Sequence, residues 1–271
     1  MTARRLRRLA WKSIGLIFTV VAFLIIYTPI VVILALPVNN SIRGYAWEGF
    51  TLKWYSDLFA TDAMKTPIVN TVAVALLSTL IATVIGTLFA IGINALDKKR
   101  RVKMMVLNNV PVVNPDIVTG ISLMIVFSLL SFTLGFGTVL IAHVFFSIPY
   151  VVLSVIPRLK KLDPNMYEAA LDLGCSRFSG MWKVIMPNIA TGILSGALMA
   201  FTMSIDDFVI TYFTSGSEYM NVSTWLYASI GRSRGFTPAA YAYNAILFVV
   251  MIVIIIFVNT YKDKKEKEII A

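Results

Sequence analysis

Six long apolar runs restrict what this chain can fold into. They cover residues 13–36, 67–96, 104–132, 134–157, 184–213 and 238–261. A helix needs about 20 apolar residues to cross the hydrocarbon core of a bilayer, and each run is at least that long. None of the runs keeps up the apolar–polar alternation of a membrane β-strand. The sequence therefore predicts an all-α membrane protein with six transmembrane helices in a single domain, residues 1–271.

Composition excludes the main alternatives to a membrane protein. Hydrophobic residues make up 58% of the 271 residues and charged residues 14%, whereas soluble domains carry roughly 25% charged residues. The same figures exclude a disordered chain. The single cysteine, Cys175, leaves no internal disulfide and no thiolate metal cluster from this chain alone. We therefore expect neither a metal site nor a cofactor in this chain.

The Lys and Arg residues predict the orientation of the six helices. Of the 24, 19 fall in the N-terminal segment, the turn after the second run, the segment after the fourth run and the C-terminal tail. Cytoplasmic loops carry an excess of Lys and Arg, so both termini are predicted to be cytoplasmic. The first run is too long for a signal peptide and is interpreted as an uncleaved helix. We attribute the net charge of +10 to this topology and to the lipid bilayer, and expect no nucleic acid partner.

The cytoplasmic segment 158–187 carries an ordered set of helix signals. Asp163-Pro164 is typical of a helix start, and Gly174 can end a short helix over residues 167–173 in the left-handed conformation. Ser176 can then cap a second short helix. The sequence predicts a compact helix–turn–helix, in which Ala169 and Ala170 provide a smooth face that another protein can approach closely.

Three carboxylates lie within the apolar runs. An ionisable residue in a membrane span is costly and points to function. Asp116 follows Pro115, so the third span is either interrupted there or begins there, with Asp116 in its first turn. Asp206 and Asp207 either line a path for a cationic solute or are interfacial acids at a helix end. Adjacent helical residues point about 100° apart, so at most one faces the path squarely.

Two further residues bear on the interpretation of these three carboxylates. Tyr212 could add cation–π contacts to a path lined by the acids. His143 has no evident metal-ligand partners in the sequence, and a buried neutral histidine bonded to a neighbouring helix is the favoured interpretation.

Four motifs together resemble a known family. Glu168-Ala169-Ala170, Gly174 and Pro187 match the E-A-A…G…I-x-L-P signature of bacterial ABC-importer permeases, with Val and Met at the usual Ile and Leu positions. F-T-L-K-W-Y at residues 50–55, P-D-I-V at 115–118 and S-I-D-D-F-V at 204–209 resemble the spermidine/putrescine importer permeases, second subunit type. This similarity runs over nearly the whole chain.

The resemblance implies a type I ABC importer permease fold in the bacterial plasma (inner) membrane. It implies a heterodimer with a homologous permease, two ATPase subunits that carry ATP and Mg, and an external solute-binding protein. Glu168, Ala169, Ala170, Gly174 and Pro187 would couple to the ATPase, and Asp116, Asp206, Asp207 and Tyr212 would line the solute path. This chain has no G-x-x-x-x-G-K-[ST] loop. It is therefore expected to be a transport subunit and not an enzyme, with ATP hydrolysis on a partner chain.

Three alternatives stay open at this point. The first is an ABC permease for another small solute, for example Fe(III). The second is a proton-coupled secondary transporter that uses Asp116 and His143, which leaves the coupling signature unexplained. The third is a membrane-embedded enzyme, for which the sequence offers no nucleophile–base set.

Overall fold

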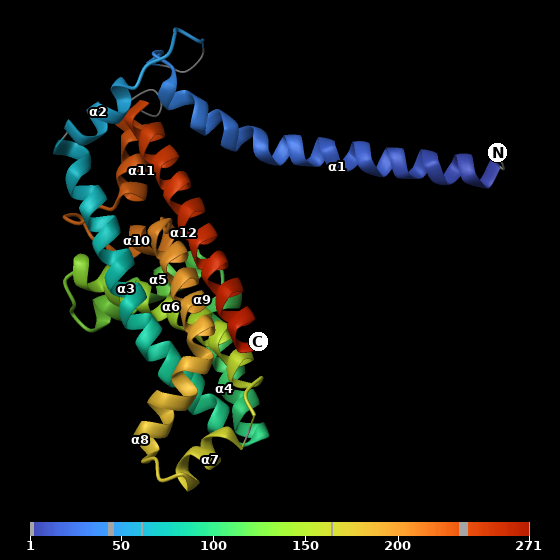
Figure 1. Ribbon diagram of the computed structural model, residues 1–271. Helices are drawn as coiled ribbons and strands as arrows, with labels where there is room; N and C mark the ends of the chain where they lie inside the picture. The colour runs from blue at the N-terminus through green and yellow to red at the C-terminus, as the bar shows by residue number, and fades with distance from the viewer. Residues whose placement is uncertain (1–2, 43–45, 61, 164, 233–237, 271) are drawn as a thin grey trace. The chain divides into compact units, whose positions relative to one another are not determined.

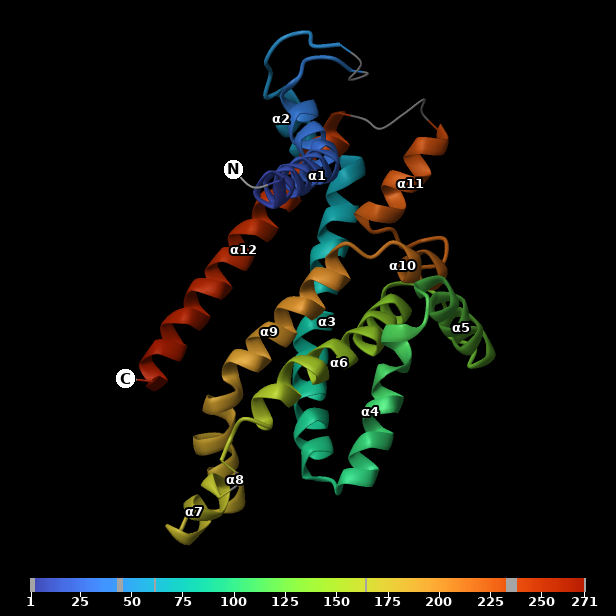
Figure 2. The same cartoon turned by 90° about the vertical axis from the view of Figure 1, so that its right-hand side faces the viewer.

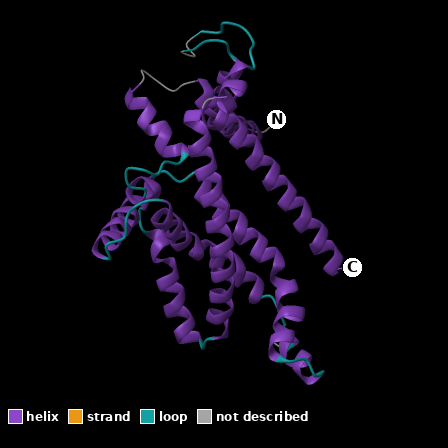
Figure 3. Ribbon diagram, turned by 90° about the vertical axis from the view of Figure 1, so that its left-hand side faces the viewer, coloured by secondary structure: helices purple, strands orange, loops and turns teal. Residues whose placement is uncertain are grey.

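The structure, a computed structural model, describes residues 3–42, 46–60, 62–163, 165–232 and 238–270. In these residues the regular secondary structure is helical apart from one isolated bridge between Asn39 and Phe50 (Figure 3). The helices, labelled in Figure 1, are α1 Ala3–Ala35, α2 Lys53–Ala60, α3 Asp62–Ala95, α4 Lys98–Val113, α5 Asp116–Leu129, α6 Phe136–Leu159, α7 Met166–Asp172, α8 Arg177–Gly180, α9 Met186–Ile205, α10 Val209–Thr214, α11 Val222–Arg232 and α12 Pro238–Ile270.

The chain divides into two compact units. One unit joins residues 1–62 to residues 229–250. In it, the side chain of Asn39 organises the loop after α1: its Nδ2 donates to the carbonyl of Ala46, and its Oδ1 accepts from the backbone N–H groups of Ser41 and Glu48. The other unit contains residues 63–228 and 251–271 and carries all the predicted site residues.

Within the described residues, five helices are long and apolar enough to cross a membrane, or six if one bent pair counts as a single span. The bent pair is α4 and α5, which meet at an angle of 101°. The break falls at Asn114, whose backbone is extended before Pro115, since proline disfavours a helical residue in front of it. The apolar run over 104–132 is therefore broken before Asp116, which begins α5 in its first turn, whereas Pro111 lies inside α4.

The fifth apolar run is not one helix, and the prediction of a continuous span over 184–213 was wrong. Helix α9 ends at Ile205, and α10 begins at Val209 after Asp206, Asp207 and Phe208. No proline or glycine marks this break. It depends on hydrogen bonds that the Asp207 side chain makes to α10, which apolar periodicity does not reveal.

The core of the larger unit lies where α3, α6 and α9 meet. Val151 on α6 lies between Gly86 of α3 and Gly196 of α9. A Cβ atom on Gly86 would come within 2.7 Å of the Val151 Cβ, and one on Gly196 within 2.9 Å of its Cα. Because both positions lack a side chain, the two helices can approach α6 closely.

Two of the segments that the sequence assigned to one side of the membrane lie together. Figure 2 shows the α3–α4 turn and the α7–α8 segment at the same end of the larger unit. After α8 the chain passes through a π-helical turn, Met181–Ile185, directly into α9. The short helices are thereby joined to a long apolar helix without an intervening loop.

Candidate solute path and coupling segment

All three of the predicted path acids line one cavity. It has a volume of about 330 Å³ and is lined from α5, α6, α9, the α9–α10 break and α10. Its lining residues are Asp116, Phe146, Tyr150, Thr202, Met203, Asp206, Asp207, Phe208, Val209 and Ile210. We call it the acidic cavity. Pockets of this size are typical of small-molecule sites.

Asp116 reaches the acidic cavity because it begins α5. It lies in the first turn, where the positive end of the helix dipole favours a carboxylate. The bend that brings it there is held by a hydrogen bond of 2.9 Å from the Asn114 amide to the Thr119 hydroxyl. Farther along α5, Gly120 lies against α10. A Cβ atom there would come within 3.0 Å of the Phe213 ring.

Asp206 and Asp207 are neighbours in the chain but differ in environment. Asp206 is exposed. Asp207 has a side chain only 9% exposed, and its Oδ2 accepts from both the backbone N–H of Thr211, at 2.7 Å, and the Thr211 hydroxyl, at 2.8 Å. Its Oδ1 accepts from the N–H of Ile210 at 3.3 Å. Asp207 therefore caps the start of α10, and Asp206 is the more accessible of the two carboxylates.

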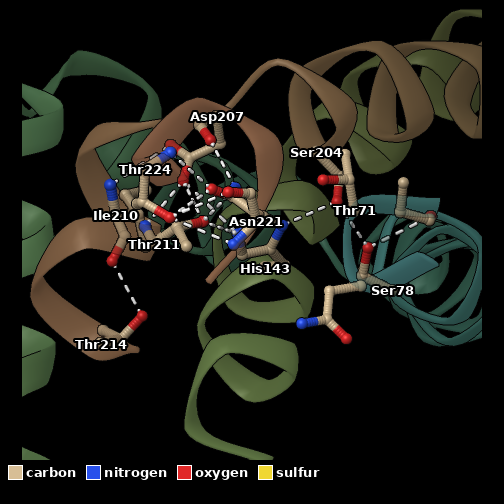
Figure 4. Close-up of polar contacts among 12 residues, drawn as sticks. Thr71, Ser78, His143, Ser204, Asp207, Ile210, Thr211, Thr214, Asn221 and Thr224 are labelled. Atoms are coloured by element: carbon tan, nitrogen blue, oxygen red, sulfur yellow. Dashed lines mark hydrogen bonds and ion pairs between the residues drawn. The ribbon is translucent and has the colours of Figure 1, made fainter. Parts of the chain in front are cut away.

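His143 connects Asp207 to the rest of the unit (Figure 4). The ring is 1% exposed, and both of its nitrogens are bonded. Nδ1 lies 2.7 Å from the Ser204 hydroxyl, and Nε2 lies 2.9 Å from the Thr211 hydroxyl and 3.4 Å from Asp207 Oδ2. The Ser204 hydroxyl in turn lies 3.0 Å from that of Ser78. Four helices, α3, α6, α9 and α10, thus contribute to one buried polar chain.

A second buried cluster attaches α11 to the same region. Asn221 and Thr224 form a reciprocal cap, in which each side chain accepts from the other residue's backbone N–H. The Asn221 amide donates to the carbonyl of Asp207 at 3.0 Å, and Val222 donates its N–H to the Thr71 hydroxyl of α3 at 2.9 Å. The α9–α10 break is therefore held both by His143 of α6 and by Asn221, the residue before α11.

Tyr212 does not line the acidic cavity. It lines a second cavity of about 560 Å³, together with Tyr219 and Tyr227. Its ring packs against Phe208, with 5.5 Å between ring centroids, and Phe208 does line the acidic cavity. Any contribution of Tyr212 to a path from the acidic cavity would therefore run through this aromatic contact.

In the candidate coupling segment, residues 158–187, the Gly174 turn and the Ser176 cap form as the sequence predicts, and the first short helix is α7 at Met166–Asp172 in place of 167–173. Pro164 lies outside the described residues. Gly174 has φ +85°, the left-handed conformation expected of it. The N–H of Cys175 donates to the carbonyl of Ala170 and that of Gly174 to the carbonyl of Leu171, the two bonds of a Schellman turn. Ser176 caps α8 by accepting from the N–H of Ser179 at 3.2 Å. Tyr167 closes the turn by donating its hydroxyl to the carbonyl of Arg177.

The segment presents both polar and apolar groups on its surface. Glu168 and Ala169 are exposed on α7, whereas Ala170 is buried, so the prediction that Ala170 forms part of an approachable face was wrong. Pro187 is exposed in the first turn of α9. Large apolar side chains are also exposed around the turn: Leu173 at 87%, Phe178 at 74% and Trp182 at 54%. Such a patch is typical of a protein interaction surface.

Sequence reasoning missed several residues of the buried polar chain. Ser78, Ser204 and Thr211 lie in or beside apolar runs as single hydroxyl residues, which are common in membrane helices. The capping role of Asp207 had a usable signal, because an acid before a helical stretch is a helix-start pattern. Asn221 and Thr224 likewise match the spacing of a reciprocal cap.

Long apolar helices, interrupted beside Asp116 and again beside Asp206 and Asp207, define a multi-pass membrane protein. The chain belongs to the binding-protein-dependent transport system inner membrane component family, whose model matches residues 82–268. It is 34% identical over 239 residues to the spermidine/putrescine transport system permease protein PotC of Escherichia coli strain K12, covering 88% of this chain and 90% of that one. It is 30% identical over 230 residues to the putrescine transport system permease protein PotI of the same strain, covering 82% and 81%.

Solved ABC transporters share the fold. A chain of a bacterial ABC transporter involved in import of the acidic polysaccharide alginate matches with a TM-score of 0.70 at 18% identity, covering 96% of this chain and 98% of that one. A chain of an amino acid ABC transporter matches with a TM-score of 0.58 at 16% identity, covering 79% and 100%. The ABC importer permease fold expected from the sequence is confirmed.

Proposed function

We propose that this chain is the permease subunit of an ABC importer that moves polyamines such as spermidine and putrescine into the cytoplasm. The observation that carries the proposal is the acidic cavity, because it combines Asp116 and the exposed Asp206 with aromatic side chains. The names of the PotC and PotI relatives support the same solute class.

The chemistry of the cavity suits a polyammonium chain. An ammonium group that leaves water needs negative or electron-rich partners to replace its hydration. Asp116 and Asp206 supply negative charge, and Phe146, Tyr150 and Phe208 supply ring faces and apolar surface for methylene groups. Alternating access would expose this site to each side of the membrane in turn.

ATP hydrolysis is assigned to partner subunits. The exposed face of α7, with Glu168 and Ala169, and the apolar patch of Leu173, Phe178 and Trp182 would contact an ATPase. A homologous permease, two ATPases and an external solute-binding protein would complete the assembly. One matching structure is that of an alginate transporter in complex with a periplasmic protein, an assembly of this kind. Both termini of this chain would be cytoplasmic.

The test is uptake of radiolabelled spermidine and putrescine in cells that lack their own polyamine importers and express the complete transporter. We expect Asp116→Asn and Asp206→Asn each to reduce uptake about tenfold or more, with membrane levels unchanged by immunoblot. Glu218→Gln, a change at an exposed acid outside the cavity, is the matched control and should transport normally.

Two additional arms separate the alternatives. Labelled Fe(III) replaces the polyamine in one arm, and an ATPase-inactive partner is used in the other. Uptake of Fe(III) but not of polyamines would overturn the proposed solute. Polyamine uptake that persists without ATPase activity would favour a proton-coupled transporter instead.

A further inference from the structure

The hydrogen bonds that join Asp207, Thr211 and Nε2 of His143 have a defined direction. The single proton of the Thr211 hydroxyl is donated to Asp207 Oδ2. Thr211 Oγ1 can therefore only accept at its 2.9 Å contact with His143, so the proton of the ring lies on Nε2. Nδ1 lies 2.7 Å from the Ser204 hydroxyl, which lies 3.0 Å from that of Ser78. The two donors beside the carboxylate of Asp207, the Thr211 hydroxyl and the ring Nε2–H, both point toward it.

The direction of these bonds assigns different tasks to the two neighbouring acids. Asp207 is occupied by Thr211, by the N–H of Ile210 and by the nearby Nε2–H of His143. Asp206 is exposed and lines the acidic cavity. Because Asp207 is fixed to α10 and to α6, the residue before it is held at the end of α9, where its carboxylate can face a solute.

His143 is not among the lining residues of the acidic cavity but packs against one of them. Its ring packs against Phe146, with 5.1 Å between ring centroids, and Phe146 lines the cavity. The ring nitrogens and the ring face thus act on different neighbours: the nitrogens hold Asp207 and Ser204, and the face supports Phe146. A substitution can remove the first function and keep the second.

We propose that His143 is a positioning residue for the solute path, which holds Asp207 as the cap of α10 through Nε2–H and thereby sets Asp206 in the acidic cavity that Asp116 also lines. The inference rests on the proposed function for its solute. It assigns His143 to the architecture of the α9–α10 break, in contrast to a proton path that joins it to Asp116.

The first test compares His143→Phe, which keeps a ring against Phe146 but has no nitrogens, with His143→Gln, whose amide can still donate to Thr211 and Asp207. We expect His143→Phe to raise the KM for spermidine uptake about tenfold with little change in maximal rate, since a displaced Asp206 weakens solute binding. His143→Gln should restore the KM to within about threefold of wild type. Ser147→Ala, one turn along α6 at a buried hydroxyl without a partner, is the matched control.

The second test does not depend on the identity of the solute. Asp206→Cys in a Cys175→Ser background is modified with a small cationic methanethiosulfonate in the purified transporter. We expect modification to be at least about threefold slower when His143→Phe is added, because without Nε2–H Asp207 is no longer held and residue 206 leaves its position in the acidic cavity. Modification should be unchanged when Ser147→Ala is added, because that change leaves the bonds of Asp207 intact.

The outcomes are distinguishable. If the wild-type transporter moves no polyamine, the proposed function fails, and the modification rates still decide the positioning role. Wild-type KM and wild-type modification rate in His143→Phe would overturn the inference. An equal rise in KM for His143→Phe, His143→Gln and Ser147→Ala would also overturn it. The site would then respond to any change in side-chain volume on α6 and not to the loss of the ring nitrogens.

Discussion

At the scale of single residues, Asp206 and Asp207 show how different surroundings give two identical side chains different roles. Three donors from α10 converge on Asp207 at distances of 2.7 to 3.3 Å. A buried carboxylate is tolerated only where such partners replace water. Asp206 has no need of them, because it is exposed at the cavity. Substitution at the two positions should therefore produce different kinds of defect.

Asp207→Asn should reduce stability. An amide at this position turns one acceptor into a donor that faces the N–H and hydroxyl groups of Thr211, so buried donors lose their partner. We expect a loss of about 1–3 kcal/mol, seen as a lower midpoint in thermal unfolding of the detergent-solubilised transporter. Asp206→Asn should unfold at the wild-type temperature. Equal midpoints for Asp207→Asn and wild type would contradict the capping role.

At the scale of secondary structure elements, the turn between α7 and α8 depends on one backbone conformation. Gly174 has φ +85°, and no atom lies within 4 Å of where its Cβ would be. A side chain there would be strained by the backbone and not by crowding. In the left-handed region, asparagine is tolerated far better than a β-branched residue.

Gly174→Val should therefore insert into the membrane but lose transport and association with the ATPase, whereas Gly174→Asn should keep a substantial part of both. The left-handed backbone costs a β-branched residue roughly 1–2 kcal/mol, enough to disfavour the native turn. Co-purification with the ATPase and polyamine uptake measure the two effects. Full transport by Gly174→Val would exclude the turn from coupling.

Helix packing at Val151 gives a second prediction at this scale. The Cβ atom of Gly196→Ala would lie 2.9 Å from the Val151 Cα, a backbone atom that cannot move away alone. We expect this variant to lower the free energy of unfolding by about 1–3 kcal/mol, through overpacking, in thermal or denaturant unfolding. Gly92→Ala on α3, which meets nothing within 4 Å, is the control and should be at least as stable as wild type.

At the scale of the whole molecule, two basic segments that the sequence predicts on the same side of the membrane also lie at the same end of the larger unit. The basic α3–α4 turn and the basic α7–α8 segment lie at one end of the larger unit (Figure 2). The α5–α6 connection and the chain before α11 belong, in the predicted topology, to the opposite side. The positive-inside rule predicts that this basic end faces the cytoplasm, as the proposed function requires.

Single cysteines in a Cys175→Ser background test this topology. Phe136→Cys and Met220→Cys should react with a membrane-impermeant maleimide added to intact cells. Arg100→Cys and Leu173→Cys should react only after the cells are opened. Labelling of Leu173→Cys from outside would reverse the orientation.

How far the sequence predicts this structure depends on how local each signal is. Apart from the break in the fifth apolar run, the membrane helices, the Gly174 turn and the Ser176 cap follow from patterns within a few residues and were predictable. The α9–α10 break depends on His143, more than 60 positions before Asp207 in the chain. The meeting of Asp116 with Asp206 at one cavity requires the 101° bend and the packing of α5 on α10, which no local pattern specifies.

The π-helical turn at Met181–Ile185 has a consequence for how changes in chain length are tolerated. A π turn holds one residue more than an α turn would, and each residue of an α-helix corresponds to about 100° of rotation. Deleting one residue there would convert the turn to α-helix and leave Glu168 and the Leu173 patch facing nearly as before, whereas deleting one residue within Met186–Ile205 would rotate them about 100° around the axis of α9. The π turn therefore offers one residue that can be lost without redirecting the candidate coupling surface, so a one-residue deletion here should be far less damaging than one farther along α9.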